Sequence, residues 1–288
     1  YGHIEAVDKR TKFVQADISD KNALDKIFKE NEIEAVIHFA GFIAVAESVA
    51  DPKKYYQNNV AATLNLLDCM LSNNVKKIVF SSTCATYGEP KYTPIDEKHS
   101  QNPINPYGRT KLIIEQIFED YKTAYKLKYI ALRYFNASGA SSDCSIGESH
   151  NPETHLIPLV LKAIKDNGTI KVFGTDYDTK DGTCIRDYIH VEDLACAHRL
   201  ALLNLDKFSG FLNVGTGIGT SVKQIINASN EVSNKNCKIE YCKRRDGDAA
   251  ILLADNKKAC EILNWKPNYT DIKDIIQSAW DWENNRKF

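Results

Sequence analysis

The feature of this sequence that most constrains its fold is the alternation of short apolar runs with helical patterns over the first 135 residues. Such alternation is typical of βαβ units, in which helices connect neighbouring strands of a parallel sheet. It predicts strands at 12–18, 35–41, 77–82 and 129–135. The second and third runs are almost continuously apolar, as expected for strands that helices cover on both faces.

Helices are predicted near 21–31, 52–73 and 106–126. After Phe135 the sequence becomes rich in small and polar residues, and we place the start of a second unit there. This later part predicts a strand at 186–191 with a helix to about Leu205, a strand at 211–214, a helix from Ser221 and a last helix ending near Trp282.

We therefore expect an α/β chain with a Rossmann-like parallel sheet, whose first βαβ segment is missing, and a smaller α/β domain. The predicted cofactor domain comprises 1–135 plus 184–206, and the predicted substrate domain comprises 136–183 plus 207–288.

Composition excludes several classes of protein. With 43% hydrophobic and 26% charged residues, the chain is neither collagen-like, disordered nor membrane-spanning. Its net charge of -1 gives no field that would attract nucleic acid or an anionic membrane. The polar start lacks the apolar stretch of a secretory signal.

The 8 cysteines contain no C-x-x-C pair and no zinc-site spacing, so we expect reduced thiols, no metal and a cytoplasmic protein. His38, His150 and His190 also lack metal-like spacing, and we interpret them as structural or solvent-facing.

Tyr107 and Lys111 lie four residues apart in NPYGRTK, at the start of a predicted amphipathic helix, so they share one face. An ammonium beside a phenol favours the phenolate, and the pair could act as a general base. This spacing alone is common, however, and an ordinary amphipathic helix explains it more often.

The predicted strand before this helix ends in Ser81, Ser82 and Thr83. Open α/β sheets bind ligands at the carboxyl ends of strands, although these hydroxyls could instead cap the following turn.

These motifs occur within a longer ordered series that covers nearly the whole chain. The series comprises HFAG (38–41), ESV (47–49), YYQNNV (55–60), FSSTCATYG (80–88), NPYGRTK (105–111), RYFNASGA (133–140), PETHLIP (152–158), DGTCIRDYIHV (181–191), NVGTGIGTSV (213–222) and RRDGD (244–248). It resembles the UDP-glucose 4-epimerase family of extended short-chain dehydrogenases/reductases.

The resemblance implies a role for each matching residue. Tyr107 would be the base for the sugar 4-hydroxyl, Lys111 its electrostatic partner and a ribose ligand, and Thr83 would bind the sugar. The implied NAD-binding residues are Asp17, Ile18, Phe39, Ala40, Gly41, Asn58, Ser81, Tyr107, Lys111 and Tyr134. The implied substrate-binding residues are Thr83, Asn136, His155, Leu156, Phe173, Arg186, Arg245, Asp248 and Leu252.

The implied reaction is C4 epimerisation of UDP-glucose and UDP-galactose through a transient 4-keto sugar and bound NAD. Nucleotide-sugar 4,6-dehydratases carry aspartate and glutamate after the strand-end threonine, whereas this chain has Cys84 and Ala85. Neither residue can serve as a carboxyl acid or base, so dehydration is disfavoured. A non-catalytic relative of the same fold stays an alternative.

Two departures from the family pattern bear on cofactor and substrate. The family's G-x-x-G-x-x-G turn is absent. Either about 40 residues precede Tyr1 in a longer gene product, which we favour, or the protein lacks its pyrophosphate site. A protein restricted to 1–288 would bind NAD poorly and aggregate. Ile43 and Leu252 stand where relatives carry lysine and tyrosine, and the smaller Leu252 suggests that UDP-N-acetylglucosamine is also accepted.

Two further segments have competing explanations. The glycines of GTGIG (215–219) do not have dinucleotide-binding spacing and predict a structural turn. The basic residues of KRRDGD (243–248) are interrupted by acids, so we favour contact with a diphosphate over nucleic acid or a plain solvated loop. The resemblance also suggests a homodimer that associates through the helices at 52–73 and 106–126.

Overall fold

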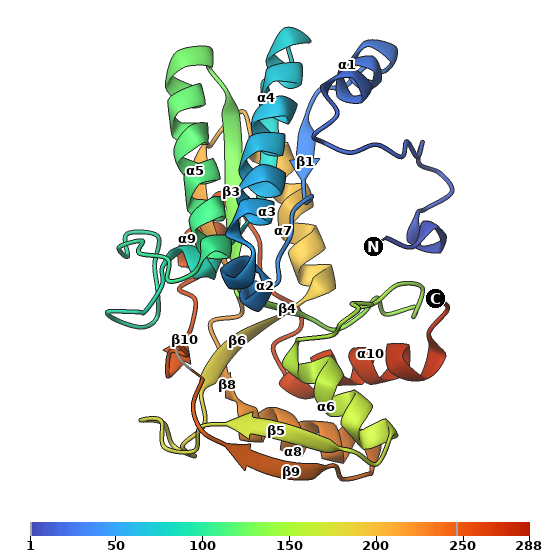
Figure 1. The fold of residues 1–288 in the computed structure, drawn as a ribbon, viewed down its shortest axis with the longest axis vertical. Helices are drawn as coiled ribbons and strands as arrows, with labels where there is room; N and C mark the ends of the chain where they lie inside the picture. The colour runs from blue at the N-terminus through green and yellow to red at the C-terminus, as the bar shows by residue number, and fades with distance from the viewer. Residues whose placement is uncertain (1, 246) are drawn as a thin grey trace.

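A computed structural model describes residues 2–245 and 247–288, and it contains a parallel four-stranded sheet with the order β1-β2-β3-β7. The strands are β1 (Val36–His38), β2 (Lys77–Thr83), β3 (Lys128–Tyr134) and β7 (Gly210–Val214). Each strand is parallel to its neighbour. Their common direction places all four carboxyl ends at one edge, which faces the second half of the molecule (Figure 1).

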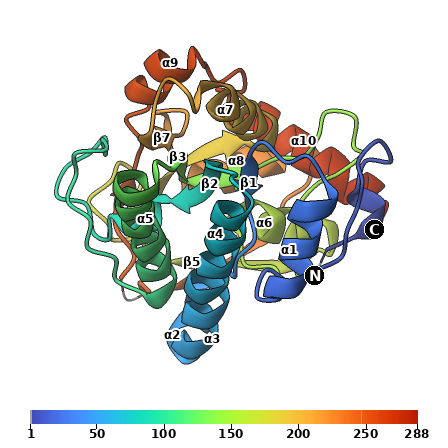
Figure 2. The ribbon, with the colours of Figure 1, turned by 90° about the horizontal axis from the view of Figure 1, so that it is seen from above.

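Helices cover both faces of this sheet, as Figure 2 shows from above. One face carries α1 (Lys21–Glu30), α4 (Ala62–Ser72) and α5 (Pro106–Tyr125), and the other carries α7 (Val191–Asn204) and α9 (Lys257–Leu263). Along β2, Ile78 and Phe80 enter the core on the first face and Val79 enters the core on the second. This alternation explains why the strand is apolar at successive positions.

The helix predicted at 52–73 is continuous but changes its winding. It consists of α3 (Pro52–Tyr55), a π-helical segment η2 (Tyr56–Ala61) and α4, and α2 (Val45–Ala50) precedes it. Asp51 caps its start by accepting a hydrogen bond from the Lys54 amide. The π-helical turn contains the buried Asn59, and such turns often occur at functional sites.

The start of α5 is strongly specified by local sequence. The Asn105 side chain accepts a hydrogen bond from the Gly108 amide at 2.8 Å, and Pro106 occupies the first helical position. Lys126 ends the helix in the left-handed conformation with φ 63°. The helix therefore begins at Pro106, one residue before Tyr107.

The second half forms a smaller α/β unit. Its strands are β4 (Asn136–Ser138), β5 (Thr169–Phe173), β6 (Ile185–His190), β8 (Gly219–Ser221), β9 (Lys238–Cys242) and β10 (Ile251–Leu252). The central β6 pairs with β4, β8 and β10, and β5 pairs with β9. The helices α6 (Leu156–Lys165), α8 (Val222–Ser233) and α10 (Ile272–Asn285) share a separate hydrophobic core with β5. Short 3-10 turns lie at Ile4–Ala6 and Cys84–Thr86.

The prediction of a strand at 12–18 is wrong. This segment is irregular, and Phe13 and Val14 are 54% and 46% exposed. A strand needs a neighbour for its main-chain groups, and β1 has one strand neighbour within the described residues, namely β2. The apolar pattern alone therefore does not produce a strand here.

The predicted domain boundaries also need correction. The segment Gly210–Val214 lies beside β3 in the first sheet, although its range was assigned to the substrate domain. Conversely, β6 belongs to the second sheet, whereas the helix α7 that follows packs against the first. The chain thus crosses between the two units within a few residues.

None of the helices in the described residues combines the length and apolarity that crossing a bilayer requires.

Candidate active site

Tyr107 and Lys111 meet the carboxyl end of β2 at the first turn of α5. The Lys111 side chain is buried, and its Nζ donates a 2.8 Å hydrogen bond to the Ser81 carbonyl oxygen. The same Nζ lies 4.7 Å from the centre of the Phe80 ring and 6.0 Å from that of Tyr107. The structure therefore brings the predicted pair and the predicted strand end into one group.

Burial dominates the titration of both groups. It lowers the pKa of Lys111 to about 8, against the opposing effect of the Glu115 carboxylate. It also raises the pKa of Tyr107 well above its usual value, and the Thr83 hydroxyl acts in the opposite direction. The expectation of a lowered pKa for this phenol is therefore wrong, because desolvation of the phenolate is the dominant effect.

The hydroxyls at the end of β2 have distinct partners. Thr83 Oγ1 accepts a 3.2 Å hydrogen bond from the Ala85 amide, so the capping interpretation is correct for this residue. The Ser81 and Tyr134 hydroxyls are hydrogen-bonded to each other across neighbouring strands. Ser82 instead points to the other side of the strand and donates to Glu115. Ser81, Thr83 and Tyr134 thus lie beside Tyr107 and Lys111, and we call these five residues the Tyr107 group.

The loop after β1 approaches this group closely. A Cβ atom on Gly41 would lie 3.7 Å from Lys111 Nζ and 3.3 Å from Asn59 Oδ1. Phe39 and Ala40, just before it, are exposed, and the Phe39 ring lies 4.6 Å from that of His198. The exposed Phe39 and Ala40 and the glycine Gly41 thus lie beside the buried Lys111.

Asn59 is a positioning residue that the sequence reasoning missed, although its neighbour Asn58 was predicted. Its side chain accepts a 2.8 Å hydrogen bond from the Phe42 amide and donates to the Phe42 carbonyl at 3.0 Å. It also donates to Thr110 on α5. Asn58 donates in turn to Asn59 Oδ1. The Asn-Asn pair in the motif was a signal for this anchor, but sequence does not show which amide is buried.

Asp17 and Ile18 lie elsewhere on the first unit, in the turn before α1. Asp17 accepts a 2.7 Å hydrogen bond from the Ser19 amide, which lowers the pKa of its carboxyl group. Ile18 packs against the core shared with α4. Among the described residues, no hydrogen bond joins this turn to the Tyr107 group.

A buried ion pair stands behind Lys111 and was also missed. Arg133 on β3 contacts the Glu115 carboxylate through Nε at 2.9 Å and Nη2 at 2.6 Å. Arg133 Nη1 also donates to the Tyr87 hydroxyl, which donates to Asn213 on β7. Residues 107, 111 and 115 repeat every four positions on α5, and this spacing could have revealed Glu115.

A second group forms around β6 and contains several predicted substrate residues. Arg186 Nη1 donates to the carbonyl oxygens of Ile185 and Ala249 at 2.9 and 2.8 Å, and its Nη2 lies 3.3 Å from Asp248 Oδ1. Leu252 on β10 is the strand partner of Arg186. The Arg245 guanidinium lies 3.8 Å from the centre of the Phe173 ring. Asp246, which lies between Arg245 and Asp248 in the sequence of the KRRDGD motif, is outside the described residues.

Cys84 is near both groups, because it follows Thr83 in the sequence and the charge of Arg186 acts on its thiol. Burial raises the pKa of its thiol to about 12, against the opposing charge of Arg186, and Cys84 in turn acts on Tyr107. We call Arg186, Asp248, Leu252, Arg245 and Phe173 the Arg186 group. Cys84 therefore lies close to both the Tyr107 group and the Arg186 group. Asn136 begins β4 directly after β3 and pairs with Tyr188 on β6, so it lies at the same junction.

His155 and Leu156 occupy the start of α6, within the second unit. His155 Nδ1 lies 2.5 Å from Glu148 Oε1, and this contact raises the pKa of His155 to about 10. His150 lies beside the same carboxylate, so the reading of this histidine as merely structural or solvent-facing overlooked a cluster. Residues 148–155 are close in sequence, but only their folded loop directs the side chains inward.

The predicted turn at GTGIG is confirmed. The Asp187 carboxylate accepts hydrogen bonds from the amides of Thr216 and Gly217 at 2.8 and 3.0 Å. A Cβ atom on Gly215 would lie 2.6 Å from this carboxylate. A buried anion thus occupies the turn, which leaves no space for a phosphate there.

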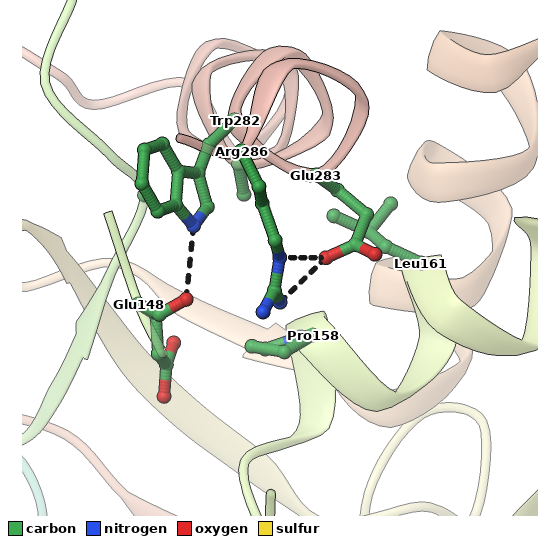
Figure 3. Close-up of a pocket in the computed structure, with 8 residues that line it drawn as sticks. Glu148, Pro158, Leu161, Trp282, Glu283 and Arg286 are labelled. Atoms are coloured by element: carbon green, nitrogen blue, oxygen red, sulfur yellow. Dashed lines mark hydrogen bonds and ion pairs between the residues drawn. The ribbon is translucent and has the colours of Figure 1, made fainter. Parts of the chain in front are cut away.

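The pocket in Figure 3 lies away from the Tyr107 group. It is formed between α6 and α10, and its lining includes Pro158, Leu161, Trp282 and Arg286. The Arg286 guanidinium is held by Glu283. Because buried polar groups converge at the Tyr107 junction rather than here, we assign the candidate active site to the junction.

Comparison with known proteins identifies the family of the chain. The NAD dependent epimerase/dehydratase family matches residues 2–215. A UDP-glucose 4-epimerase of Lacticaseibacillus casei is 49% identical over 288 residues, covering 99% of this chain and 87% of the relative. The crystal structure of a Brucella ovis UDP-glucose 4-epimerase in complex with NAD has a TM-score of 0.93 and 48% identity, covering 97% of this chain and 87% of that one.

A third relative is the UDP-Glc/GlcNAc 4-epimerase of Campylobacter jejuni. Its structure has a TM-score of 0.83 and 41% identity, and it covers 96% of this chain and 85% of that one. The family match includes Tyr107, Lys111 and Arg186 and ends before Arg245, Asp248 and Leu252. The chain belongs to the NAD dependent epimerase/dehydratase family.

Proposed function

We propose that this protein interconverts UDP-glucose and UDP-galactose by inverting C4 of the sugar, with NAD as its cofactor. The observation that carries the proposal is the convergence of Tyr107, Lys111 and Thr83 at one edge of the sheet, opposite Arg186. Relatives with nearly half of their residues identical carry the name of this activity.

The chain's residues fit a nicotinamide cofactor. The close approach of Gly41 to Lys111 leaves a side-chain-free surface beside a buried ammonium, and Phe39 and Ala40 are open next to it. Ser81, Asn58, Tyr134, Asp17 and Ile18 complete the proposed NAD-binding set. When bound, NAD supplies reversible hydride acceptance, so the overall reaction needs no second redox substrate.

In the proposed mechanism, Tyr107 acts as a phenolate, a form that its burial disfavours in the chain alone and that a bound cationic nicotinamide would favour. Its Oη removes the proton of the sugar 4-hydroxyl and later returns that proton to the oxygen on the inverted C4. Thr83 orients the hydroxyl by hydrogen bonding. Lys111 holds a positive charge near the phenol and, through Ser81, fixes the first turn of α5 against β2. The buried surroundings of the pair exclude water and strengthen these interactions.

The Arg186 group is proposed to hold the uridine diphosphate, with Arg245, Asp248, Phe173, Asn136, His155 and Leu156. A guanidinium fork can contact phosphate oxygens through two parallel hydrogen bonds. Arg186 is already oriented by two carbonyl oxygens, so little side-chain entropy is lost on binding.

Cys84 and Ala85 distinguish epimerisation from dehydration, the other activity in the family's name. Elimination of water across the sugar needs an acid and a base after Thr83, and a buried thiol with a pKa near 12 and an alanine provide neither.

The test is conversion of UDP-galactose to UDP-glucose by the full-length protein, monitored by NMR of the anomeric proton without an added reductant. We expect the reaction to proceed until UDP-galactose and UDP-glucose are present at equilibrium. The absence of UDP-glucose from a folded protein that carries NAD would refute the proposal.

A second substrate, UDP-N-acetylglucosamine, is favoured by Leu252. Leu252 is the strand partner of Arg186, and Leu252 and Cys84 pack against the same buried cluster, which supports a place near both groups. A leucine there is smaller than a tyrosine, and the Campylobacter relative is named for both sugars. No conversion of the acetylated sugar would refute this extension.

We further propose a cytoplasmic homodimer with no nucleic-acid or membrane partner. The charge balance and the free thiols support this location. The pairing would use the outer surfaces of α4 and α5, which pack against each other through η2. Sedimentation at several protein concentrations would test the dimer, and a monomer at all of them would exclude it.

A further inference from the structure

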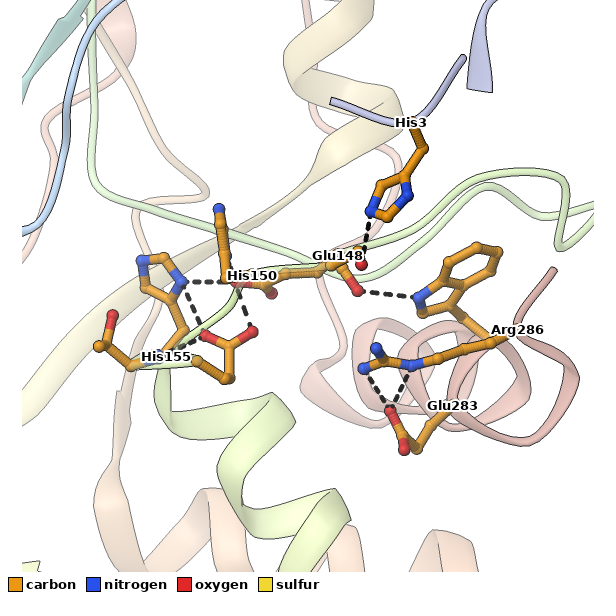
Figure 4. Close-up of polar contacts among 10 residues, drawn as sticks. His3, Glu148, His150, His155, Glu283 and Arg286 are labelled. Carbon is orange, nitrogen blue, oxygen red and sulfur yellow. Dashed lines mark hydrogen bonds and ion pairs between the residues drawn. The ribbon is translucent and has the colours of Figure 1, made fainter. Parts of the chain in front are cut away.

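Four potential metal ligands converge before α6, outside the Tyr107 group (Figure 4). They are Glu148, His150, Glu153 and His155, and their ligand atoms all lie within 4.8 Å of one another. Glu148 Oε1 is 3.1 Å from His150 Nδ1 and 2.5 Å from His155 Nδ1. Glu153 carboxylate oxygens lie 3.7 Å and 3.4 Å from the same two nitrogens. Both imidazoles therefore direct Nδ1 to the centre of the cluster.

The backbone that carries these side chains is held from outside the cluster. Trp282 on α10 donates a 2.9 Å hydrogen bond to the Glu148 carbonyl oxygen. A Cβ atom on Gly147 would lie 2.4 Å from the Trp282 indole, so only glycine allows this contact. His3 is hydrogen-bonded to the Ser149 hydroxyl at 3.0 Å and stacks on Phe288. The loop is thus fixed by both ends of the chain.

One carboxylate oxygen of the cluster lacks a donor. Glu153 Oε1 accepts from the amides of Thr154 and His155 at 2.7 and 2.8 Å. Glu153 Oε2 is buried and accepts no hydrogen bond from the described residues. A buried carboxylate oxygen without a donor is costly, and a bound cation would satisfy it.

We propose that Glu148, His150, Glu153 and His155 bind one divalent cation of the zinc class. Zinc accepts imidazole nitrogen and carboxylate oxygen at about 2.0 to 2.2 Å, which places neighbouring tetrahedral ligands about 3.4 Å apart. The observed separations bracket this value, so rotation of the side chains completes the site. Two imidazoles favour zinc over magnesium and calcium, which prefer oxygen ligands alone.

The role of this ion is structural. It joins residues 148–155 to the first turn of α6, and it takes no part in hydride or proton transfer. The ion would fix His155 and Leu156 at the start of the helix, in the unit assigned to the nucleotide. The proposal does not depend on the proposed epimerase activity, because its test substitutes His150 and Glu153, which are not among the proposed substrate residues, and measures bound metal.

The test measures zinc in the full-length protein after metal removal and dialysis against Zn²⁺ buffered by a weak chelator. The site variant is the double substitution His150→Ala and Glu153→Gln. The control is Asp166→Asn, which removes an exposed carboxylate just after α6 that offers no atom to the cluster. Circular dichroism establishes that each protein is folded. The 8 cysteines make the difference between variants, rather than the total, the relevant quantity.

We expect the unsubstituted protein and Asp166→Asn to retain about one zinc ion more than the double variant, and Zn²⁺ to raise their Tm selectively. Cobalt substitution should give visible d–d absorption without a thiolate charge-transfer band, and magnesium should not compete. Equal zinc in all three proteins, or a cobalt spectrum with thiolate character, would overturn the proposal. Such results would mean that the cluster is only a set of histidine–glutamate ion pairs.

Discussion

The ammonium group of Lys111 lies 2.8 Å from the carbonyl oxygen of Ser81, which joins the first turn of α5 to the carboxyl end of β2. This hydrogen bond places a buried cation at the point where the strand-end hydroxyls and Tyr107 converge. The arrangement costs stability because the charge is desolvated, so we infer that it is maintained for function.

Replacing Tyr107 with phenylalanine should remove the proposed proton transfer while leaving the fold intact. We expect kcat for UDP-galactose to fall at least about a hundredfold, the scale of general acid–base catalysis. The control is Tyr241→Phe, since Tyr241 is 58% exposed on β9. Turnover of Tyr107→Phe equal to that of the control would contradict the assigned role.

Replacing Lys111 with methionine should separate stability from activity. The change removes a buried charge but also a hydrogen-bond donor to Ser81. We expect the free energy of unfolding at pH 7 to rise by about 1 to 3 kcal/mol and turnover to be lost. Urea denaturation measures the first effect. Lys122→Met, on the exposed part of the same helix, should alter stability by less than about 0.5 kcal/mol. A large loss of stability in Lys111→Met would show that the hydrogen bond outweighs desolvation.

The same lysine predicts a specific pH dependence. Burial lowers the folded-state pKa of Lys111 from 10.5 to about 8, so the unfolded chain binds more protons between these values. The free energy of unfolding therefore rises with pH from about 8 to 10.5, relative to a protein without this group. Comparing the unsubstituted protein with Lys111→Met cancels the other titrating residues. The stability difference between them should narrow over this interval, and a constant difference would contradict the shift.

Replacing Glu115 with glutamine should destabilise the protein, because it leaves the Arg133 guanidinium buried without its counter-charge. Breaking one partner of a buried pair costs about 3 to 5 kcal/mol, which urea denaturation would detect. Glu30→Gln is the matched control, since its pair with Lys26 is exposed and 3.8 Å long. That control should cost less than about 1 kcal/mol. Similar losses in both variants would mean that the ion pair contributes little.

Replacing Leu252 with tyrosine should reduce space beside the sugar-binding group. We expect kcat/KM for UDP-N-acetylglucosamine to fall at least about tenfold relative to UDP-glucose, the scale of steric discrimination between similar substrates. Leu203→Tyr, at a position 62% exposed on α7, provides the control. An unchanged ratio between the two sugars would exclude Leu252 as a determinant of specificity.

The sequence by itself determined the local elements and the motif order. Apolar periodicity located β2, β3 and α5 within one residue, because a strand covered on both faces and a capped helix each leave a distinct pattern. The spacing of Tyr107 and Lys111 and the series of family motifs identified most of the residues at the junction.

Only the tertiary structure decided which of these elements and residues meet. The segment 12–18 has a strand-like pattern but no ladder, and β7 joins β3 from beyond the expected boundary, because strand pairing depends on distant neighbours. The pKa of Tyr107 rises where the motif suggested a fall, since burial is a property of the packed site. Likewise, the donors of Glu148, His150, Glu153 and His155 converge only when Trp282 and His3 hold their loop, and spacing alone contains no such information.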